Sequence, residues 1–380
     1  MGGSLRVGRF VGIDVFLHWT FLLLIAGAFV YYVLSGNDLA TALAGVGLIL
    51  AVFACVVLHE YGHALAARRY GVPTRDITLY PIGGVARLER IPEKPRQELV
   101  VALAGPAVNF VVAGLIAGGY LVTRGSLPDF NEFGGLAAPA DYFLPSLMWI
   151  NVALLVFNLL PAFPMDGGRV LRALLALKLD YPRATQIAAS VGQGMAIVFG
   201  FFGLIQFNPF LLFIALFVYL GAQQESSATQ LRVATRGVHV RQAMVTDYHD
   251  LHPWQTLQDA VDLLLAVSEQ DFPVIQDGQM VGVLTRKRLV QALSEQTMQT
   301  RVQQVMLPAP APVNAGNMLD QALERLQADD VSMLPVVDQE GALVGLLTLE
   351  NVGEMMMLAS AMRRRTGMAP SLDSLAEGRS

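Results

Sequence analysis

The amino-acid sequence predicts a polytopic α-helical membrane protein of about six transmembrane helices, followed by a soluble α/β region built from two repeats. Of its 380 residues, 54% are hydrophobic and 15% are charged, whereas soluble proteins average about 25% charged residues. The long uncharged runs lie almost entirely within residues 10–222, while residues 239–358 have an ordinary globular composition. The two regions are therefore expected to fold in two different solvents, lipid and water.

Six apolar segments are candidates for membrane spans, since about 20 apolar residues are needed to cross the hydrocarbon core of a bilayer. The first segment lacks a convincing small-residue cleavage site, so we expect it to remain on the chain as a helix. The last segment is rather short. The six segments are residues 14–34, 41–67, 97–122, 142–160, 184–206 and 209–222.

The distribution of Lys and Arg between these segments predicts how the chain is oriented in the membrane. Thirteen of these residues lie before the first span and in the connections 68–96 and 161–183, whereas the connections on the opposite side hold only Arg124. Connections rich in Lys and Arg stay on the cytoplasmic side. We therefore expect a multi-pass protein of the plasma or inner membrane with both termini in the cytoplasm.

The charge of the chain argues against nucleic-acid binding. The formal net charge is −5, and the basic residues lie at membrane boundaries and in short clusters. Proteins that bind nucleic acid present a sustained basic patch, because contacts with phosphates dominate their affinity. No nucleic acid is expected among the partners.

A metal-binding pattern lies inside the second apolar segment, in the run His59-Glu60-Tyr61-Gly62-His63. Residues four apart share a helix face, so the two imidazoles can bind one ion while Glu60 reaches a water molecule beside it. A metal ion with an adjacent carboxylate that carries protons is the chemistry of metal-assisted hydrolysis. In a soluble helix these residues often form a solvated polar face. Within a membrane span they are costly unless they pair, bind an ion or line water, and this favours the metal site.

A catalytic zinc site usually has a third protein ligand and an open position, and two residues are candidates for this ligand. Cys55 lies one turn before His59, but an ion between His59 and His63 lies further along the helix. A small buried apolar residue is the simpler interpretation of this cysteine. Asp166 is the better candidate because prolines interrupt the fourth span, and broken helices at membrane depth line polar cavities. On spacing alone, Asp166 could instead cap the helix that follows it.

Three motifs in the same order resemble those of the site-2 protease family of intramembrane zinc metalloproteases. The resemblance covers residues 10–222. Gly105 and Asn109, in the second motif, are expected to serve close helix packing and support around the site. The motifs are the H-E-x-x-H run on the second span, Ala104-Gly105-Pro106-Ala107-Val108-Asn109 on the third, and the N-x-x-P-x-x-P-x-D-G-G run from Asn158 to Gly168.

The resemblance implies roles for five residues. One catalytic Zn²⁺ ion is expected on His59, His63 and Asp166, with Glu60 as the catalytic acid and base. Asn158 is expected to orient the substrate or to stabilise the oxyanion. An alternative role for Asn158 is hydrogen bonding between packed helices.

The segment of residues 79–88, between the second and third spans, is extended in character. Similar segments in the family form a hairpin that enters the membrane. Its edge at Gly83, Gly84 and Val85 is the expected substrate-binding element, because strand addition supplies main-chain hydrogen bonds that a substrate helix loses when it unwinds. The alternative is an ordinary surface loop.

Residues 239–358 repeat themselves, which predicts two similar α/β units. Each copy reads as an amphipathic helix, a short apolar strand, a turn, a second strand and a closing helix. Such a unit buries its sheet best by packing against the second copy of the repeat. The matching runs are 62 or 63 residues apart and begin at Gln242 and Gln304, at Phe272 and Leu334, and at Gly282 and Gly345.

This repeat resembles a tandem pair of CBS domains, the module named after cystathionine beta-synthase. The resemblance implies an adenine nucleotide between the copies, with Thr285 and Thr348 as candidate contacts, and face-to-face association into a homo-oligomer. Nucleotide-binding members commonly carry an aspartate three residues after the threonine, where this chain has Arg288 and Asn351. The chain therefore lacks the aspartate that contacts the ribose of the nucleotide in those members. The basic run 286–288 is equally consistent with phosphate attraction and with the solvated start of a helix.

The expected organisation has five parts. Residues 1–222 form the intramembrane metalloprotease domain, and residues 223–238 form a linker. The first and second CBS domains cover residues 239–298 and 299–358. The tail of residues 359–380 is expected to be disordered because its composition is basic, small and polar.

The resemblance implies a site-2-type zinc metalloendopeptidase that hydrolyses peptide bonds in or next to transmembrane segments of membrane-bound substrates. The cytoplasmic CBS pair would be its regulatory module, and a membrane-tethered transcription regulator or an anti-sigma factor would be a typical substrate. The alternative is a CBS-regulated membrane transporter or metal-ion carrier whose histidines bind an ion in transit. Glu60 argues against transport, because a transport site needs no free carboxylate beside two ligands.

Overall fold

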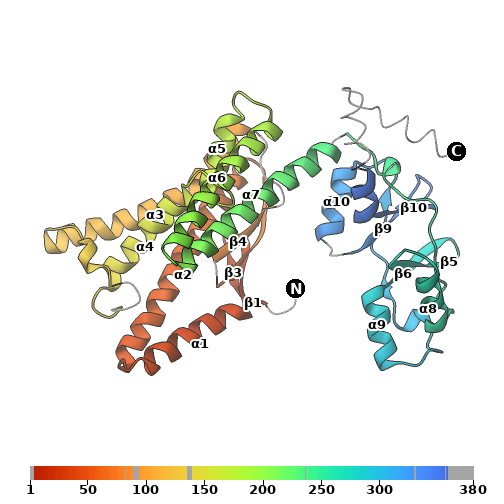
Figure 1. The fold of residues 1–380 in the computed structure, drawn as a ribbon, viewed down its shortest axis with the longest axis horizontal. Helices are drawn as coiled ribbons and strands as arrows, with labels where there is room; N and C mark the ends of the chain where they lie inside the picture. The colour runs from red at the N-terminus through yellow and green to blue at the C-terminus, as the bar shows by residue number, and fades with distance from the viewer. Residues whose placement is uncertain are drawn as a thin grey trace. The chain divides into compact units, whose positions relative to one another are not determined.

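The chain divides into two compact units, Met1–Gln230 and Leu231–Ser380, in the computed structural model. Figure 1 shows long helices in the first unit and shorter helices with small sheets in the second. The tail of residues 359–380 lies outside the described residues, so its expected disorder stays a prediction. The structure describes residues 4–81, 83–88, 94–134, 139–235, 237–328, 331–355 and 357.

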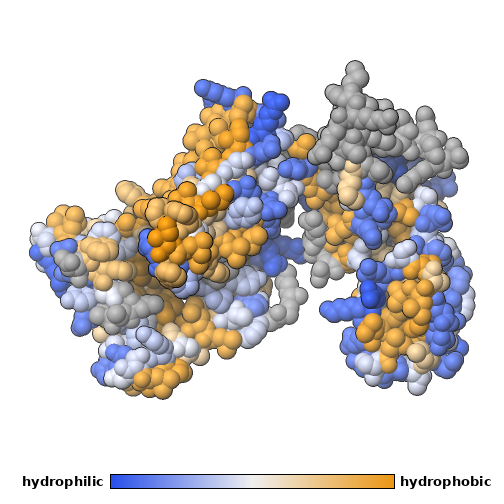
Figure 2. Space-filling view, viewed as in Figure 1, coloured by the Kyte–Doolittle hydropathy of each residue, from blue (hydrophilic) through white to orange (hydrophobic). Residues whose placement is uncertain are grey.

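The first unit is built mainly from apolar helices. Within the described residues, two apolar helices are short, α1 (Trp19–Leu34) and α4 (Phe143–Asn158), and four are long enough to cross a membrane. Many of their apolar side chains point outward, and hydrophobic residues gather over this unit in Figure 2. An exposed apolar surface of this kind is expected where the surrounding solvent is lipid. The four long helices are α2 (Leu39–Arg68), α3 (Pro95–Arg124), α6 (Tyr181–Ile205) and α7 (Pro209–Thr235).

A four-stranded sheet accompanies these helices, and two of its strands were not expected. The sheet order is β1-β2-β3-β4, with antiparallel outer pairs and a parallel central pair. The first expected span, from residue 14, begins instead with a strand up to His18, and α1 follows from Trp19. Apolar residues alternate with Asp14 there, which is the period of a half-buried strand. The strands are β1 (Ser4–Phe10), β2 (Ile13–His18), β3 (Thr74–Tyr80) and β4 (Gly83–Leu88).

One face of the sheet packs against the C-terminal half of α2. Ile13, Val15 and Ile77 from the sheet form a buried cluster with Tyr61 and Ala64 of α2. These two α2 residues lie within and next to the metal-binding pattern. The sheet is therefore fixed beside the helix turns that carry the histidines.

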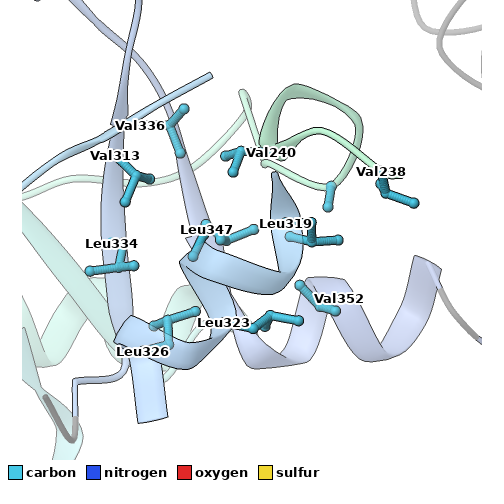
Figure 3. Close-up of a cluster of buried hydrophobic side chains, with 12 residues drawn as sticks. Val238, Val240, Val313, Leu319, Leu323, Leu326, Leu334, Val336, Leu347 and Val352 are labelled. Atoms are coloured by element: carbon cyan, nitrogen blue, oxygen red, sulfur yellow. The ribbon is translucent and has the colours of Figure 1, made fainter. Parts of the chain in front are cut away.

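The second unit contains the two repeats, each with a three-stranded sheet. The sheet orders are β5-β6-β7 and β10-β9-β8, and each sheet has a buried apolar core. Each core also includes residues from the start of the other repeat, Val302 in the first core and Val240 in the second. Figure 3 shows the second core, where Val240, Leu319 and Leu347 meet. Val283 of the first repeat packs with Leu346 of the second, so the copies bury apolar surface against each other. The main elements are α8 (Leu257–Ala266), β5 (Asp271–Gln276), β6 (Gln279–Thr285), α9 (Arg286–Glu295), β7 (Leu307–Pro308), β8 (Val313–Asn314), α10 (Leu319–Ala328), β9 (Met333–Val337) and β10 (Leu343–Thr348).

Helix α7 runs through most of the expected linker of residues 223–238. It continues as one helix to Thr235, so the polar run that suggests a linker is helical. Eight of residues 223–235 are Gln, Glu, Ala, Leu or Arg, which are good helix formers. The polar composition marks the end of the apolar span but not the end of the helix.

Candidate active site and metal centre

Two helices bring three buried donor groups together. His59 and His63 lie on α2, and Asp166 is the first residue of α5 (Asp166–Leu175). The two Nε2 atoms are 3.0 Å apart, and each lies 3.1 Å from Oδ2 of Asp166. The three residues are only 6%, 4% and 7% exposed. The structure therefore brings together all three residues that the sequence analysis expects to bind the metal.

The loop before α5 directs Asp166 toward the histidines. Helix α4 ends at Asn158, and the chain turns back through the proline-containing residues 159–165 before α5 begins. The N-cap position of α5 is occupied by Met165, and no side chain caps the helix. Asp166 therefore does not serve as the helix cap, which is the alternative that spacing leaves open. Its carboxylate faces the two imidazoles.

The surroundings of His63 fix which of its ring nitrogens is free. Its Nδ1 lies 2.7 Å from the carbonyl oxygen of Val101 on α3, and this geometry requires Nδ1 to donate. The lone pair of Nε2 is then left for a ligand, an arrangement typical of histidines that bind metal. The Nδ1 atom of His59 is buried without a hydrogen-bond partner among the described residues.

Gly105 on α3 provides the space around the donor atoms. A Cβ atom at this position would lie 2.2 Å from Nε2 of His63 and 2.6 Å from Nε2 of His59. Gly62 makes the reciprocal close approach, since its Cβ would lie 2.6 Å from the carbonyl oxygen of Ala104. Only glycine allows α2 and α3 to approach this closely while the imidazoles stay together.

The donor set fits a zinc ion. A tetrahedral zinc ion with bonds of about 2.0–2.2 Å holds nitrogen and oxygen ligands about 3.3 Å apart. The spacings of 3.0 and 3.1 Å here are close to that separation. Two imidazoles and one carboxylate also match the composition of catalytic zinc sites with an open fourth position. Cys55 is buried one turn away on α2 and is not one of the three grouped residues.

Strand β4 passes directly over Glu60. A Cβ atom on Gly84 would lie 3.0 Å from Cγ of Glu60 and 3.1 Å from Cγ1 of Val56. Within the described part of the chain, β4 pairs only with β3 and forms an end of the sheet. Gly83, Gly84 and Val85 thus lie on an edge strand, as the hairpin interpretation expects, and not in an irregular surface loop.

Two asparagines flank the site. Asn158 is half-buried at the last residue of α4, where the loop that carries Asp166 begins. Asn109 lies one turn after Gly105 on α3, and both polar atoms of its buried amide lack partners among the described residues. The sequence predicts close helix packing and support around the site for Asn109. An asparagine inside an apolar span is itself a signal of a functional polar site.

Arg172 is a second residue whose place the sequence does not reveal. Its position in the charged connection after the fourth span suggests a residue at the membrane surface. The structure buries it fully on α5, where its Nε donates to Oε1 of Glu98 over 2.7 Å and Nη1 pairs with Glu225. The connection is therefore not uniformly exposed.

Thr285 and Thr348, the candidate nucleotide contacts, occupy equivalent positions in the two repeats. Thr285 is the last residue of β6 and Thr348 the last residue of β10, and each Oγ1 accepts a hydrogen bond over 3.2 Å from the backbone N–H three residues later. The donors are Arg288 and Asn351. Both hydroxyls thus cap the first turn of the following helix.

Comparisons with known proteins also divide the chain into an N-terminal part and a C-terminal part with two repeats. Residues 47–199 match peptidase family M50, and residues 240–295 and 302–354 match the CBS domain. A zinc metalloprotease of Methanocaldococcus jannaschii is 34% identical over 284 residues, which are 75% of this chain and 78% of that protein. Stage IV sporulation protein FB of Bacillus subtilis is 24% identical over 180 residues, 45% of this chain and 57% of that protein.

A solved structure of the site-2 protease from Methanocaldococcus jannaschii is also similar. Its sequence is 38% identical, the match covers 59% of this chain and 95% of that chain, and the TM-score is 0.42. The likeness to a zinc metalloprotease over most of both chains favours hydrolysis over the transporter or ion-carrier alternative. The chain belongs to the site-2 protease family, peptidase family M50, and is an intramembrane zinc metalloprotease with a tandem pair of CBS domains.

Proposed function

We propose that His59, His63 and Asp166 hold one catalytic Zn²⁺ ion and that Glu60 is the acid and base of peptide hydrolysis. The single observation that carries this proposal is the convergence of three buried donor atoms, 3.0 to 3.1 Å apart, next to Glu60 on α2. A cluster of this kind inside an apolar helix bundle is costly unless it binds an ion. The family membership supports zinc as that ion.

The chain's own residues then divide the reaction between them. Zinc held by His59, His63 and Asp166 would act as a Lewis acid, which polarises the peptide carbonyl and lets water lose a proton near neutral pH. Glu60 accepts the proton of the attacking water and later donates it to the leaving amine. Asn158, and also Asn109, have amides that can donate to the developing oxyanion. The hydrogen bond from His63 to Val101 keeps the imidazole in the tautomer that can bind metal.

The substrate is proposed to bind as an added strand on β4. A transmembrane helix hides its peptide bonds in its own hydrogen bonds, so it must unwind locally before hydrolysis. An edge strand compensates the exposed groups by main-chain pairing. Gly83, Gly84 and Val85 supply that edge, and the contact distance between Gly84 and Glu60 favours cleavage of the strand paired there.

The cytoplasmic side, regulation and partners are proposed on separate grounds. The excess of Arg and Lys in alternate connections supports a multi-pass protein with both termini in the cytoplasm. We propose a membrane-tethered regulator or anti-sigma factor as substrate, CBS domains at residues 239–298 and 299–358, and a homo-oligomer formed through them.

An adenine nucleotide is proposed to bind between the repeats near Thr285 and Thr348. Calorimetric titration of the full chain with ATP and AMP tests this nucleotide site. Absence of heat at millimolar nucleotide would exclude the site.

The direct test of the catalytic proposal compares the wild type with Glu60→Gln. Both proteins are purified in detergent, their bound zinc is measured, and cleavage of a membrane-protein substrate is followed. The variant is expected to keep its zinc, because Glu60 is not a ligand, and to cleave about 10²–10⁴-fold more slowly. Glu350→Gln, at an exposed position of the second unit, is the matched control. Retention of both zinc and full cleavage by Glu60→Gln would exclude the proposed mechanism.

A further inference from the structure

One face of α7 packs along the segment that carries Asp166. Val218 is buried in a cluster with Ala162 and Met165 of the loop before α5. One turn later, Ala222 joins a buried cluster with Phe163. Residues three, four and seven apart share a helix face, so a single stripe of α7 follows this loop residue by residue.

Gly221, on the same stripe, marks the closest approach. A Cβ atom at this position would lie 2.6 Å from Cδ of Pro164, two residues before Asp166. Such a contact is shorter than side chains tolerate, so a larger residue at Gly221 must move either α7 or the loop. The loop conformation that directs Asp166 toward the histidines therefore depends on a glycine of α7.

Glu225 continues the stripe and makes a charged contact with α5. Its carboxylate pairs with Nη1 of the fully buried Arg172, whose Nε also donates to Glu98. The guanidinium lies 5.0 Å from the ring centres of both Phe163 and Tyr181. A buried arginine is stable only while its partners stay in place, because an uncompensated charge in this environment is strongly unfavourable. Arg172 of α5 therefore links α5 to both α3 and α7.

The ion pair reaches Asp166 through the helix itself. Asp166 and Arg172 are six residues apart on the ten-residue helix α5, which is about 9 Å along a rigid α-helix. A shift of Arg172 is transmitted along this short helix to its first residue. A change at Glu225 should thus alter the position of the Asp166 carboxylate relative to the two imidazoles.

The far end of α7 belongs to the second unit. α7 is one helix from Pro209 to Thr235, and the second unit begins at Leu231. Leu231 packs against the core of the second CBS repeat, with Val238 and Leu319 among its members. Leu231 lies six positions after Glu225 on the same helix.

We propose that Gly221 and Glu225 are positioning residues for Asp166, so that a shift of α7 changes the metal affinity of the active site. This proposal rests on the proposed role of Asp166 as a zinc ligand. It predicts reciprocal coupling, since any effect of α7 on zinc binding must be matched by an effect of zinc on α7.

Zinc affinity of the full chain is the first test. We expect Glu225→Gln and Gly221→Ala to weaken zinc binding by about 10–100-fold, the usual effect of losing a group that orients a ligand. Glu225→Asp, which keeps the charge, should recover part of the affinity. The controls are Gly194→Ala, at a helical glycine of α6 with open space around it, and Asp180→Asn, in an exposed ion pair with Arg183. Affinity is measured by competition with a chelator.

Hydrogen exchange separates positioning from a general loss of stability. In the wild type, zinc should slow amide exchange in α5 and in residues 226–235 of α7. In Glu225→Gln, zinc should still protect α5 but no longer residues 226–235. Unchanged zinc affinity in both test variants, or equal protection of residues 226–235 in wild type and Glu225→Gln, would overturn the proposal. Failure of the wild type to bind zinc would instead overturn the proposed function.

Discussion

Each donor residue of the metal centre is held by a different physical constraint. The carbonyl oxygen of Val101 orients His63. The absence of a side chain at Gly105 leaves space for the imidazole of His59. The loop before α5 directs Asp166 toward both histidines. None of these constraints comes from the metal. Each donor is therefore oriented by contacts within the protein itself, which favours tight binding of an ion.

The Asp166→Asn variant tests the proposed third ligand. The amide keeps the shape of the side chain but removes its negative charge, and a neutral oxygen is a weaker zinc ligand than a carboxylate. We expect zinc affinity to fall by more than about 100-fold, beyond the loss caused by disturbing an orienting group. Bound zinc is measured after dialysis against a chelator. Zinc content equal to that of the wild type would exclude Asp166 as a ligand, and Asp180→Asn serves as the control.

At the residue scale, the sequence predicts the donor set but not its surroundings. The spacing of His59 and His63 predicts two ligands on one helix face, whereas Asp166 depends on the resemblance because spacing also allows a helix cap. The space left by Gly105 and the burial of Arg172 both result from the packing of α3 against α2 and α5, which a single sequence does not show. Such close approaches between distant segments leave no periodic signal in a single sequence.

Strand β4 is the element of the sheet that lies next to Glu60. It forms an end of the four-stranded sheet and carries Gly84 next to Glu60. The sheet in turn packs on α2 through Ile77 and its neighbours. Because both the strand and the helix are regular elements, they would fix the distance between Glu60 and a substrate strand paired with β4, as proposed.

The Gly84→Ala variant tests this arrangement. The new methyl group would meet Cγ of Glu60 at 3.0 Å and Cγ1 of Val56 at 3.1 Å, so the strand or the carboxylate must shift by a few tenths of an ångström. We expect cleavage to slow by about 10–100-fold, because small displacements of reacting groups are costly, while zinc content stays unchanged. Gly194→Ala is the control. Full activity in Gly84→Ala would show that β4 does not position the substrate beside Glu60.

At the element scale, the hairpin of residues 79–88 was expected and β1 and β2 were not. Residues 13–18 adjoin the apolar helix α1 directly, so a hydropathy window merges strand and helix into one span. The same limitation acts in reverse on α7, where polar residues 223–235 conceal a helix that continues beyond the apolar run. Hydropathy reports the solvent around a segment, and backbone conformation is a separate property.

The whole molecule combines two regions that are stabilised in different solvents. The helices of the first unit expose large apolar side chains such as Leu115, Val122 and Phe210, whereas each CBS repeat buries a compact apolar core. The division into a membrane region and a soluble repeat was predicted from composition and self-similarity, because both signals extend over many residues.

Cysteine labelling tests the proposed orientation of the whole chain. The native sequence has one cysteine, Cys55, which is buried, so single cysteines can be introduced at exposed positions without background labelling. We expect Ser126→Cys to react with an impermeant maleimide in intact cells, and Ser294→Cys to react only after permeabilisation. The opposite pattern would reverse the proposed topology and place the CBS pair outside the cell.

X-ray absorption spectroscopy at the zinc edge tests the proposed ligand set of His59, His63 and Asp166, because it reports the atoms bound to the ion. For the purified chain, the account predicts nitrogen and oxygen neighbours at about 2.0–2.2 Å with the outer-shell scattering of two imidazoles. Replacing His59 or His63 with alanine should remove one imidazole or all of the zinc. A sulfur neighbour at about 2.3 Å, as Cys55 would supply, or a spectrum without imidazole would exclude this ligand set.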